Sequence, residues 1–520
     1  MLLVAALVAG CAAVGPDYQR PEVDLKDDWT LASAEGLVET VPGAPIAWWE
    51  VFTDPLLTEL VQEAYAQNLD LEVAGLRILE ARARLGIATG NQYPQSQSVN
   101  GSALATGLST NRPNFVSALA DDTFTDAALS FDAAWEIDFW GRYRRGVEAA
   151  EADLAAALAA YDAGLVSLTA ETARIYFLVR TIEERIRFVR NDIAIQGRSL
   201  EIVQVQARNG LVTELDVQQA ATLYESTAAQ LPLLQGDLER ARNALSVLLG
   251  QMPGDLEARL GTGDIPDPPA EVAVGVPAEL LRRRPDVRLA ELLAAGQSAR
   301  VGVAQSEKYP AFGLAGSIGL RASDARGADL GDIFTGDSVE YFAGPVFSWP
   351  ILNYGRISNS VRVQDARLQQ QLVLYQSTVL GAAREVEDAL AGYVRAREAA
   401  AHYARGVEAA GRAVDLALLQ YRDGIADYQR VLETQRQLNI QHQFYAQTRG
   451  DIVTSLVGIY RALGGGWELR DGRPVIDETT RLEMQERTNW GGLLDPSEVP
   501  AEPEVPAPAG EQPLLRGPDW

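Results

Sequence analysis

The stretch that decides the fold is residues 309–320, which reads YPAFGLAGSIGL. Its large apolar residues recur at even spacing: Phe312, Leu314, Ile318 and Leu320. A period of two is typical of a strand that has one apolar face. Pro310 disfavours helix at the residue before it, so a preceding helix is expected to end at Tyr309. A partner strand is expected to end near Trp349, which predicts a β-hairpin.

This stretch has a counterpart earlier in the chain, because Tyr93-Pro94 precedes Tyr309-Pro310 by 216 residues (309 − 93). Four further pairs share an offset of 216 or 214: Leu69-Asp70 with Pro285-Asp286, Trp140-Gly141-Arg142 with Tyr354-Gly355-Arg356, Asn209-Gly210 with Asp423-Gly424, and Leu249-Gly250 with Leu463-Gly464. Such order predicts a tandem duplication, with repeats at 48–250 and 278–464 joined by a linker at 251–277. The strands of the first repeat are expected at about 95–107 and 124–137.

Each repeat continues from its strands into a very long helix. In the first repeat, apolar residues spaced by seven are each followed four residues later by a second row: Leu168, Ile175, Ile182 and Val189, then Thr172, Val179, Ile186 and Ile193. The second repeat shows the same spacing more thinly, at Val379, Val386 and Tyr393. This heptad pattern indicates a coiled-coil seam. The helix from Gly141 to Arg208 contains no proline and could reach ~100 Å before a turn at Asn209-Gly210 and a return helix to about Leu249.

Two hairpins give only four strands per chain. No uninterrupted apolar stretch of the ~20 residues that a spanning helix needs follows Cys11. A chain that crosses a bilayer without such a helix must do so as a closed barrel, because an open sheet edge in lipid leaves backbone groups unpaired. Outer-membrane barrels begin at about eight strands. Three copies would supply twelve strands and a pseudo-sixfold ring of helical hairpins.

The N-terminus resembles that of a bacterial lipoprotein. Residues 1–10 are almost entirely apolar and predict a signal peptide, and small residues lead directly to Cys11, as in a lipobox. The sequence therefore predicts lipidation at Cys11 and a lipid-anchored arm over 11–47; Ala12, rather than an aspartate, favours the outer membrane. The alternative is a buried cysteine in an ordinary apolar segment. A signal peptide begins with positive charge, and since Arg20 is the first basic residue, the true start is expected upstream.

Composition argues against several functions. The formal net charge is −26, which disfavours nucleic-acid binding because phosphates are neutralised by basic patches. His402, His442 and Cys11 are the only histidines and cysteine, so we expect no metal site, no cofactor and no enzyme activity. Proline and glutamate accumulate after about residue 477, which predicts that the 465–520 segment carries a flexible acidic tail.

The chain resembles the TolC-like outer-membrane efflux proteins, in particular the lipoprotein branch that serves RND-type pumps. The residues that carry the resemblance span roughly 45–465: Trp48-Trp49, Phe52, Asp54-Pro55-Leu56, Asp138-Phe139-Trp140-Gly141-Arg142, Leu281-Arg282-Arg283-Arg284-Pro285-Asp286, Gly344-Pro345 and Ser348-Trp349-Pro350-Ile351, together with both Tyr-Pro pairs. The resemblance implies an α+β membrane protein that forms a homotrimer. Its twelve-stranded β-barrel in the outer membrane would continue into a periplasmic α-helical barrel, with an equatorial collar between them.

The implied function is the outer-membrane channel of a tripartite efflux system, exporting small molecules from the periplasm. Its implied partners are a periplasmic membrane-fusion adaptor and an inner-membrane RND-type pump. The turns at Gly210 and Gly424 would form the periplasmic mouth that meets the adaptor. Drugs, metal ions and secreted proteins all stay open as cargo, since the pump selects it. Met252 is the only methionine between the start and Met484, so no methionine ladder for copper or silver is expected.

The resemblance also assigns a gate near these turns. Glu433 lies where the family often carries an aspartate ring, and Arg430 replaces a residue that is acidic in some members. Asp216 and Tyr421 match a pair that holds the helices closed. The alternative for the charged residues is an ordinary solvated helix face. The competing function for the whole chain is a non-conducting, lipid-anchored periplasmic coiled-coil scaffold, which accounts for the heptads but leaves the alternating strands unexplained.

Overall fold

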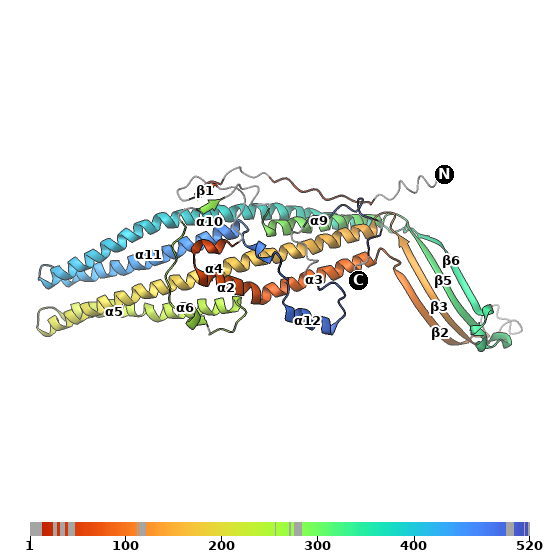
Figure 1. Ribbon diagram of the computed structural model, residues 1–520, viewed down its shortest axis with the longest axis horizontal. Coiled ribbons are helices and arrows are strands. Elements are labelled where there is room, and N and C mark those ends of the chain that lie inside the picture. The colour runs from red at the N-terminus through yellow and green to blue at the C-terminus, as the bar shows by residue number, and fades with distance from the viewer. Residues whose placement is uncertain are drawn as a thin grey trace.

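The computed structural model describes residues 13–23, 29–31, 37–39, 47–111, 113, 121–254, 256–269, 272–274, 283–495, 504–513 and 515–517. The predicted signal peptide and Cys11 lie outside these residues. The molecule is elongated, with a β-sheet at one end and the turns of two helical hairpins at the other (Figure 1). The distance between the two ends follows from the length of the helices that connect them.

The elements repeat along the chain. The first repeat contains α2 (Pro55–Gln67), α3 (Leu69–Gly90), β2 (Ser96–Gly107), β3 (Thr123–Ile137), α4 (Arg142–Arg208), α5 (Glu214–Ala228) and α6 (Gln230–Leu248). The second contains α9 (Pro285–Ser306), β5 (Ala311–Ser323), β6 (Val339–Ser348), α10 (Arg356–Arg422) and α11 (Tyr428–Ala462). Helices α4 and α10 are each 67 residues long, and both ends are offset by 214 residues (356 − 142 and 422 − 208). This equality confirms the tandem duplication.

Shorter elements surround the two repeats. Before the first repeat lie β1 (Leu37–Glu39) and η1 (Trp48–Phe52). Between the repeats lie α7 (Leu256–Leu260) and β4 (Val272–Val274), and β4 pairs in parallel with β1. The β5–β6 connection contains η2 (Ala325–Gly327), η3 (Leu330–Phe334) and η4 (Gly336–Ser338), and after the second repeat come η5 (Trp467–Arg470) and α12 (Glu478–Arg487).

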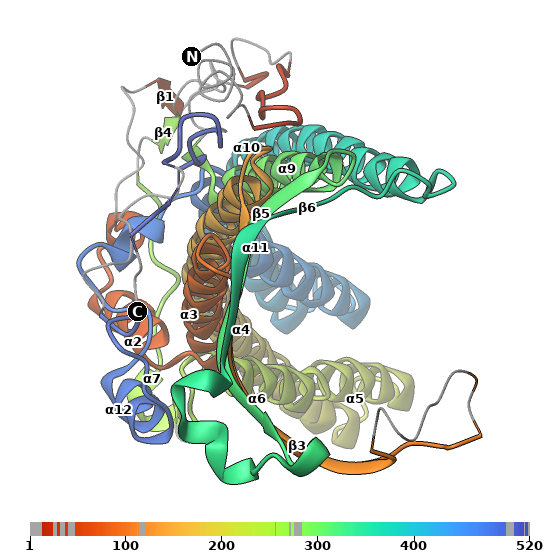
Figure 2. The same ribbon diagram turned by 90° about the vertical axis from the view of Figure 1, so that its right-hand side faces the viewer.

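The four long strands form one antiparallel sheet in the order β2-β3-β5-β6. Each strand is continuous with a helix, and α3, α4, α9 and α10 lie side by side in the same order as the strands. The sheet and helices therefore make a single wall. Figure 2 shows this wall from the sheet end as an arc, with α2, α7 and α12 on its convex side.

The two faces of the sheet differ in polarity. The register places Phe131 beside Ile318 and Ile318 beside Tyr341, on a face whose large side chains are apolar. That face carries the exposed residues Val99, Leu129, Phe131, Phe312, Leu314, Ile318, Tyr341 and Phe347. The opposite face carries the polar residues Ser98, Asn100, Asp126, Ser130, Asp132, Ser317, Arg321 and Glu340, together with the exposed apolar residues Leu104, Phe342 and Val346. A sheet with one exposed apolar face suits a boundary between lipid and water.

The helical seams are buried as the heptads predict. Val189 and Val179 are fully buried, and so are Val386 and Tyr393 in the second repeat. One prediction about the helices is wrong: the return helix of the first repeat is divided at Ala229 into α5 and α6. Pro232 explains the division, because proline cannot donate to the carbonyl four residues earlier and its ring clashes with that group. In the second repeat α11 has no proline and is continuous.

The prediction of a flexible tail is also wrong for the described residues beyond 477. Ile476, Met484 and Leu494 pack with Leu79 of α3 in a separate hydrophobic cluster. Further on, the hydroxyl of Tyr93 donates to the carbonyl of Arg516 at 2.6 Å. The few apolar residues of this cluster hold the described part of the segment around α12 against the convex side of the wall (Figure 2).

Among the described helices, one is long and apolar enough to cross a membrane. Part of α4 is apolar enough, although the sequence predicts no spanning helix after Cys11. However, 56% of that segment is buried inside the fold, where it packs against neighbouring helices. Its apolar character is therefore accounted for by the helical core.

Candidate functional site

The two hairpin turns have the same geometry. Gly210 and Gly424 adopt φ of +74° and +71° at the ends of α4 and α10. In each turn the residue after the glycine donates its backbone N–H back to the helix: Leu211 to Gln206 at 3.0 Å and Ile425 to Gln420 at 2.8 Å. This is the Schellman arrangement that ends many helices. Leu211 and Ile425 are 72% and 74% exposed, so each tip presents an apolar side chain at the end of the molecule.

Tyr421 and Asp216 lie near one another at the tips. Within the described part of the chain, no hydrogen bond joins their side chains. The hydroxyl of Tyr421 donates to the side chain of Gln206, which links α10 to α4. The Asp216 carboxylate accepts from the hydroxyl and the backbone N–H of Thr213, at 2.7 and 3.0 Å, and closes a capping box. Burial raises the pKa of Tyr421, and the charge of Asp216 raises it further. Its phenol is therefore a neutral donor at physiological pH.

The other two predicted gate residues are exposed on α11. Arg430 donates to the side chain of Gln420 at 3.3 Å, across the turn. Glu433 forms an ion pair of 3.2 Å with Arg436 of the same helix, and both side chains are more than half exposed. Within one chain, Arg430 and Glu433 lie on a helix face that is exposed to solvent. Their role in a gate stays a prediction.

A small hydrophobic cluster joins the two hairpins just above their turns. We call it the tip cluster; it consists of Val203, Ala220, Leu223, Ala417, Tyr421, Tyr428, Val431 and Leu432. The rings of Tyr421 and Tyr428 lie 5.2 Å apart at its centre. The tip cluster draws residues from α4, α5, α10 and α11, so it holds the hairpins together at the far end.

Above the tip cluster, α4 and α11 meet through buried polar side chains, of which the sequence interpretation named only His442. We call these residues the polar row: Asp192, Gln196 and Ser199 on α4, with Gln435, Asn439 and His442 on α11. A signal for them was present, because the heptad series that ends at Val189 reaches Gln196 at its next position. An amide at such a position interrupts an apolar seam.

Two arginines at the start of α4, next to the sheet, were also missed. Arg145 is buried and donates to the carbonyls of Val14 and Gly15 and to Asp17, at 2.7–3.4 Å. Arg144 contacts Asp138 at 3.3 Å and the carbonyl of Ala509 at 3.4 Å. Both ends of the described chain therefore dock at the junction between sheet and helices. The sequence showed the charges but gave no sign of their buried partners.

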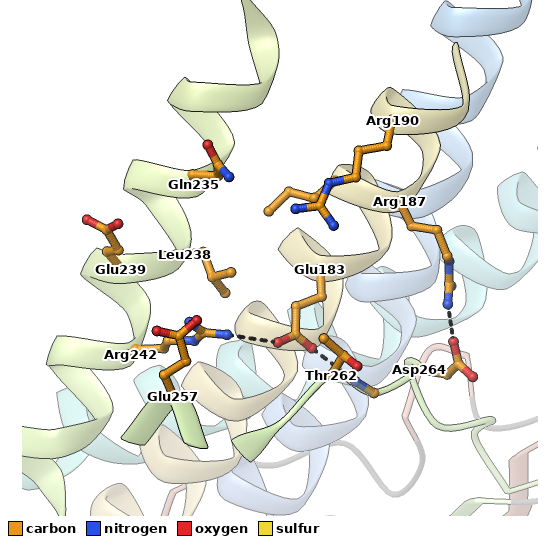
Figure 3. Close-up of a pocket in the computed structure, with 12 residues that line it drawn as sticks. Glu183, Arg187, Arg190, Gln235, Leu238, Glu239, Arg242, Glu257, Thr262 and Asp264 are labelled. Carbon is orange, nitrogen blue, oxygen red and sulfur yellow. Dashed lines mark hydrogen bonds and ion pairs between the residues drawn. The ribbon is translucent and has the colours of Figure 1, made fainter. Parts of the chain in front are cut away.

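A cavity of about 700 Å³ lies between α4, α6 and the segment after α7. Figure 3 shows that its charged side chains contact one another across the cavity wall. Glu183 accepts from Arg242 at 3.4 Å and from the backbone of Gly263 at 3.3 Å, and Arg187 pairs with Asp264. The contacts of Gly263 and Asp264 tie the linker to α4, and the Glu183–Arg242 pair joins α4 to α6. Groups of three or more residues suited to metal binding are not found in the described part of the chain.

The chain matches the family model described as outer membrane efflux protein over residues 60–251 and 276–465. The two matched segments begin 216 residues apart (276 − 60) and end 214 apart (465 − 251), which reproduces the offsets of the internal duplication. They fall on the two repeats and leave out both chain ends.

Similar proteins and structures agree with this match. The chain is 29% identical over 464 residues to Nodulation protein T of Rhizobium leguminosarum bv. trifolii, covering 89% of this chain and 96% of the relative. It is 27% identical over 463 residues to a probable outer membrane lipoprotein, SilC, of Salmonella typhimurium, covering 89% and 97%. Its fold matches the outer-membrane channel OprN with a TM-score of 0.81 and 31% identity, over 87% of this chain and 99% of that one. The chain therefore belongs to the outer membrane efflux protein family and is an efflux channel of the outer membrane.

Proposed function

We propose that three copies of this chain assemble into one conduit for small molecules from the periplasm to the exterior. In this homotrimer the four-stranded sheets close a twelve-stranded barrel, and the helical hairpins close a periplasmic tube. The exposed apolar face of the sheet is the observation that carries the proposal. Eight large apolar side chains would face water in a single chain, and lipid is the environment that removes this cost.

The sheet edges support assembly. Strands β2 and β6 lie at the two edges of the four-stranded sheet, where each has a partner on one side only. In lipid such edges leave backbone donors and acceptors unpaired at a cost of several kcal/mol per group. Pairing β6 of one copy with β2 of the next removes every edge. The polar face, with Asn100, Asp132 and Ser317, then lines a water-filled lumen.

The hairpin tips form the periplasmic end of this conduit. The turns at Gly210 and Gly424 present the exposed side chains of Leu211 and Ile425. We assign these apolar side chains to contact with a membrane-fusion adaptor, which in turn meets an inner-membrane RND-type pump. Asp216, Tyr421, Arg430 and Glu433 lie within the same region and form the gate in the closed state. We assign no covalent chemistry to the chain, since a conduit selects and opens rather than reacts.

The first experiment measures the mass and shape of the protein extracted from outer membranes in mild detergent, by light scattering and negative-stain imaging. A trimer with a long hollow stem is the expected result. A monomer, or a dimer released without detergent, contradicts the proposal, because four strands then leave the barrel open. That outcome would favour a lipid-anchored scaffold. Lipidation of Cys11 is checked in the same preparation by mass spectrometry of the N-terminal peptide.

A further inference from the structure

The polar row lies in the middle of the seam between the two hairpins. At its upper level the ring of His442 contacts Asp192 at 2.9 Å, and at its lower level the amide of Gln435 donates to the hydroxyl of Ser199 at 2.6 Å. Because α4 and α11 run antiparallel, Gln196 and Asn439 both fall between these two levels along their helices. The row thus has three polar levels, each with one residue from each helix.

The middle level is not satisfied within the protein. Gln196 is only 2% exposed, and neither its amide nitrogen nor its amide oxygen has a hydrogen-bond partner. The side-chain nitrogen of Asn439, which is 8% exposed, also lacks one. Buried amides without partners destabilise a packed seam, and polar sites of this kind bind water. Separation of the two helices at the middle level therefore breaks no hydrogen bond of the Gln196 amide and lets it bind water.

The row divides two hydrophobic regions. Above it, the main core includes Ile186 and Val189 of α4, and below it the tip cluster begins at Val203. Between Val189 and Val203, α4 contributes no buried residue to either cluster. A packed core resists deformation because its contacts are lost together, so movement concentrates where the apolar packing is interrupted.

Solvent-sized space lies against the row. A cavity of about 480 Å³ is lined by Ser199 and His442 of the row and by Val414 and Asp415 of α10. Water in this cavity can reach the lower and upper levels without passing through the core. Polar side chains that lose each other as partners during a movement can then take water instead.

We propose that the polar row is a hydrated hinge, at which water bound by Gln196 and Asn439 lets the seam part below Asp192 while the core above stays packed. The hinge moves the tip cluster and the turns at Gly210 and Gly424 as one unit. An apolar residue at Gln196 would continue the heptads and make the seam more stable. The amide therefore lowers the stability of the closed seam and makes its opening easier. The inference rests on the proposed function of the tips as a gate.

Covalent locks above and below the hinge test it in the intact trimer. Cys11 is the only cysteine of the chain, so a new pair of cysteines can be cross-linked selectively by a short thiol-reactive reagent. The lower lock is Ser199→Cys with Gln435→Cys. The upper lock is Glu184→Cys with Arg449→Cys, which replaces an ion pair of 2.9 Å between the same two helices. Conductance is recorded in planar bilayers at voltages and pH values at which the native trimer opens.

The lower lock is expected to reduce opening events at least tenfold, with recovery when the cross-link is reduced, whereas the upper lock leaves them unchanged. Equal block by both locks would mean that the whole seam moves, and no block by the lower lock would mean that the seam does not part there; either result overturns the hinge. A native trimer that never conducts contradicts the proposed function instead, so the two failures are distinguishable.

A second pair of variants needs no cross-link. Gln196→Leu with Asn439→Leu closes the middle level with apolar side chains and is expected to raise thermal stability while lowering opening frequency. Thr181→Val with Thr448→Val is the matched control, since it removes buried hydroxyls that bond only within their own helices, to Phe177 and Phe444. Hydrogen exchange of residues 196–206 reports the same hinge without conductance. Unchanged exchange in the leucine variant contradicts the proposal.

Discussion

Arg145 and Glu148 form an ion pair of 2.8 Å in which both side chains are almost fully buried. Arg145 also holds the N-terminal arm through Asp17, and the Glu148 carboxylate accepts from the backbone N–H of Ala509 at 3.1 Å. One ion pair on the first turns of α4 therefore joins the two chain ends. The pair therefore holds residues 14–17, near the start of the described chain, against the junction between sheet and helices.

Replacing Arg145 with Met is expected to free both chain ends. It leaves the Glu148 carboxylate buried without its cation, which typically costs ~3–5 kcal/mol. Limited proteolysis and hydrogen exchange should show loss of protection at residues 13–17 and 504–513. The control is Arg174→Met, because the Arg174–Glu171 pair is exposed on both sides and such pairs contribute ~0–1 kcal/mol. Equal protection in both variants would contradict the joining role of Arg145.

Glu433→Ala is expected to raise leak through the resting channel. Three symmetry-related carboxylates near one axis would narrow the closed aperture and exclude anions within a screening length of ~8 Å at physiological salt, so their removal should widen the aperture and admit anions. Conductance of the purified trimer in a planar bilayer measures the leak. Glu398→Ala removes an exposed carboxylate farther from the tip, also in an ion pair, and should leave the leak unchanged. An unchanged conductance for Glu433→Ala would remove this residue from the gate.

Gly424→Ala is expected to destabilise the turn by conformation alone. An added Cβ meets no atom within 4 Å, but φ is +71°, where a side chain costs ~1–2 kcal/mol. Gly411→Ala in α10 also meets open space, has ordinary helical geometry, and should stabilise by ~0.5–1 kcal/mol. Thermal midpoints and exchange of residues 420–428 distinguish the two. A cost at Gly411 as large as at Gly424 would contradict the left-handed requirement.

Asp162 gives a prediction about pH. Burial raises the pKa of its carboxyl to about 6, although Arg470, at 2.7 Å, lowers it. A folded-state pKa above the unfolded value means that stability is greatest at low pH and is lost as the pH rises from about 4 to 6. Hydrogen exchange in Trp467–Arg470, corrected for intrinsic rates, should slow severalfold between pH 7 and pH 5. Asp162→Asn should abolish this dependence, and a dependence that survives the substitution would assign it to other groups.

The fold was predictable because the spacing of individual apolar residues along the chain shows which segments are strands and which are helices. Even spacing around Ile318 gave the strand, and spacing by seven around Val189 gave the buried seam. The division at Ala229 was missed although Pro232 was visible. The docked tail was missed because a few apolar residues such as Leu494 decide it, and average composition does not record them. At the candidate site the turns at Gly210 and Gly424 were located correctly, whereas the polar row needs knowledge of which helices face each other.

Adjacent residues in the middle of β5 provide a test of which face meets lipid. Ile318 lies on the apolar face beside Phe131, and Ser317 lies on the opposite face, in register with Asp132. Ile318→Arg is expected to cost ~2–4 kcal/mol of barrel stability, the cost of an arginine at the bilayer midplane. Ser317→Arg should fold normally, because its guanidinium can stay hydrated and pair with Asp132, and should change conductance. Heat-resistant trimer on gels measures the first effect and bilayer recording the second. Loss of trimer in Ser317→Arg with normal trimer in Ile318→Arg would reverse the assignment of the faces.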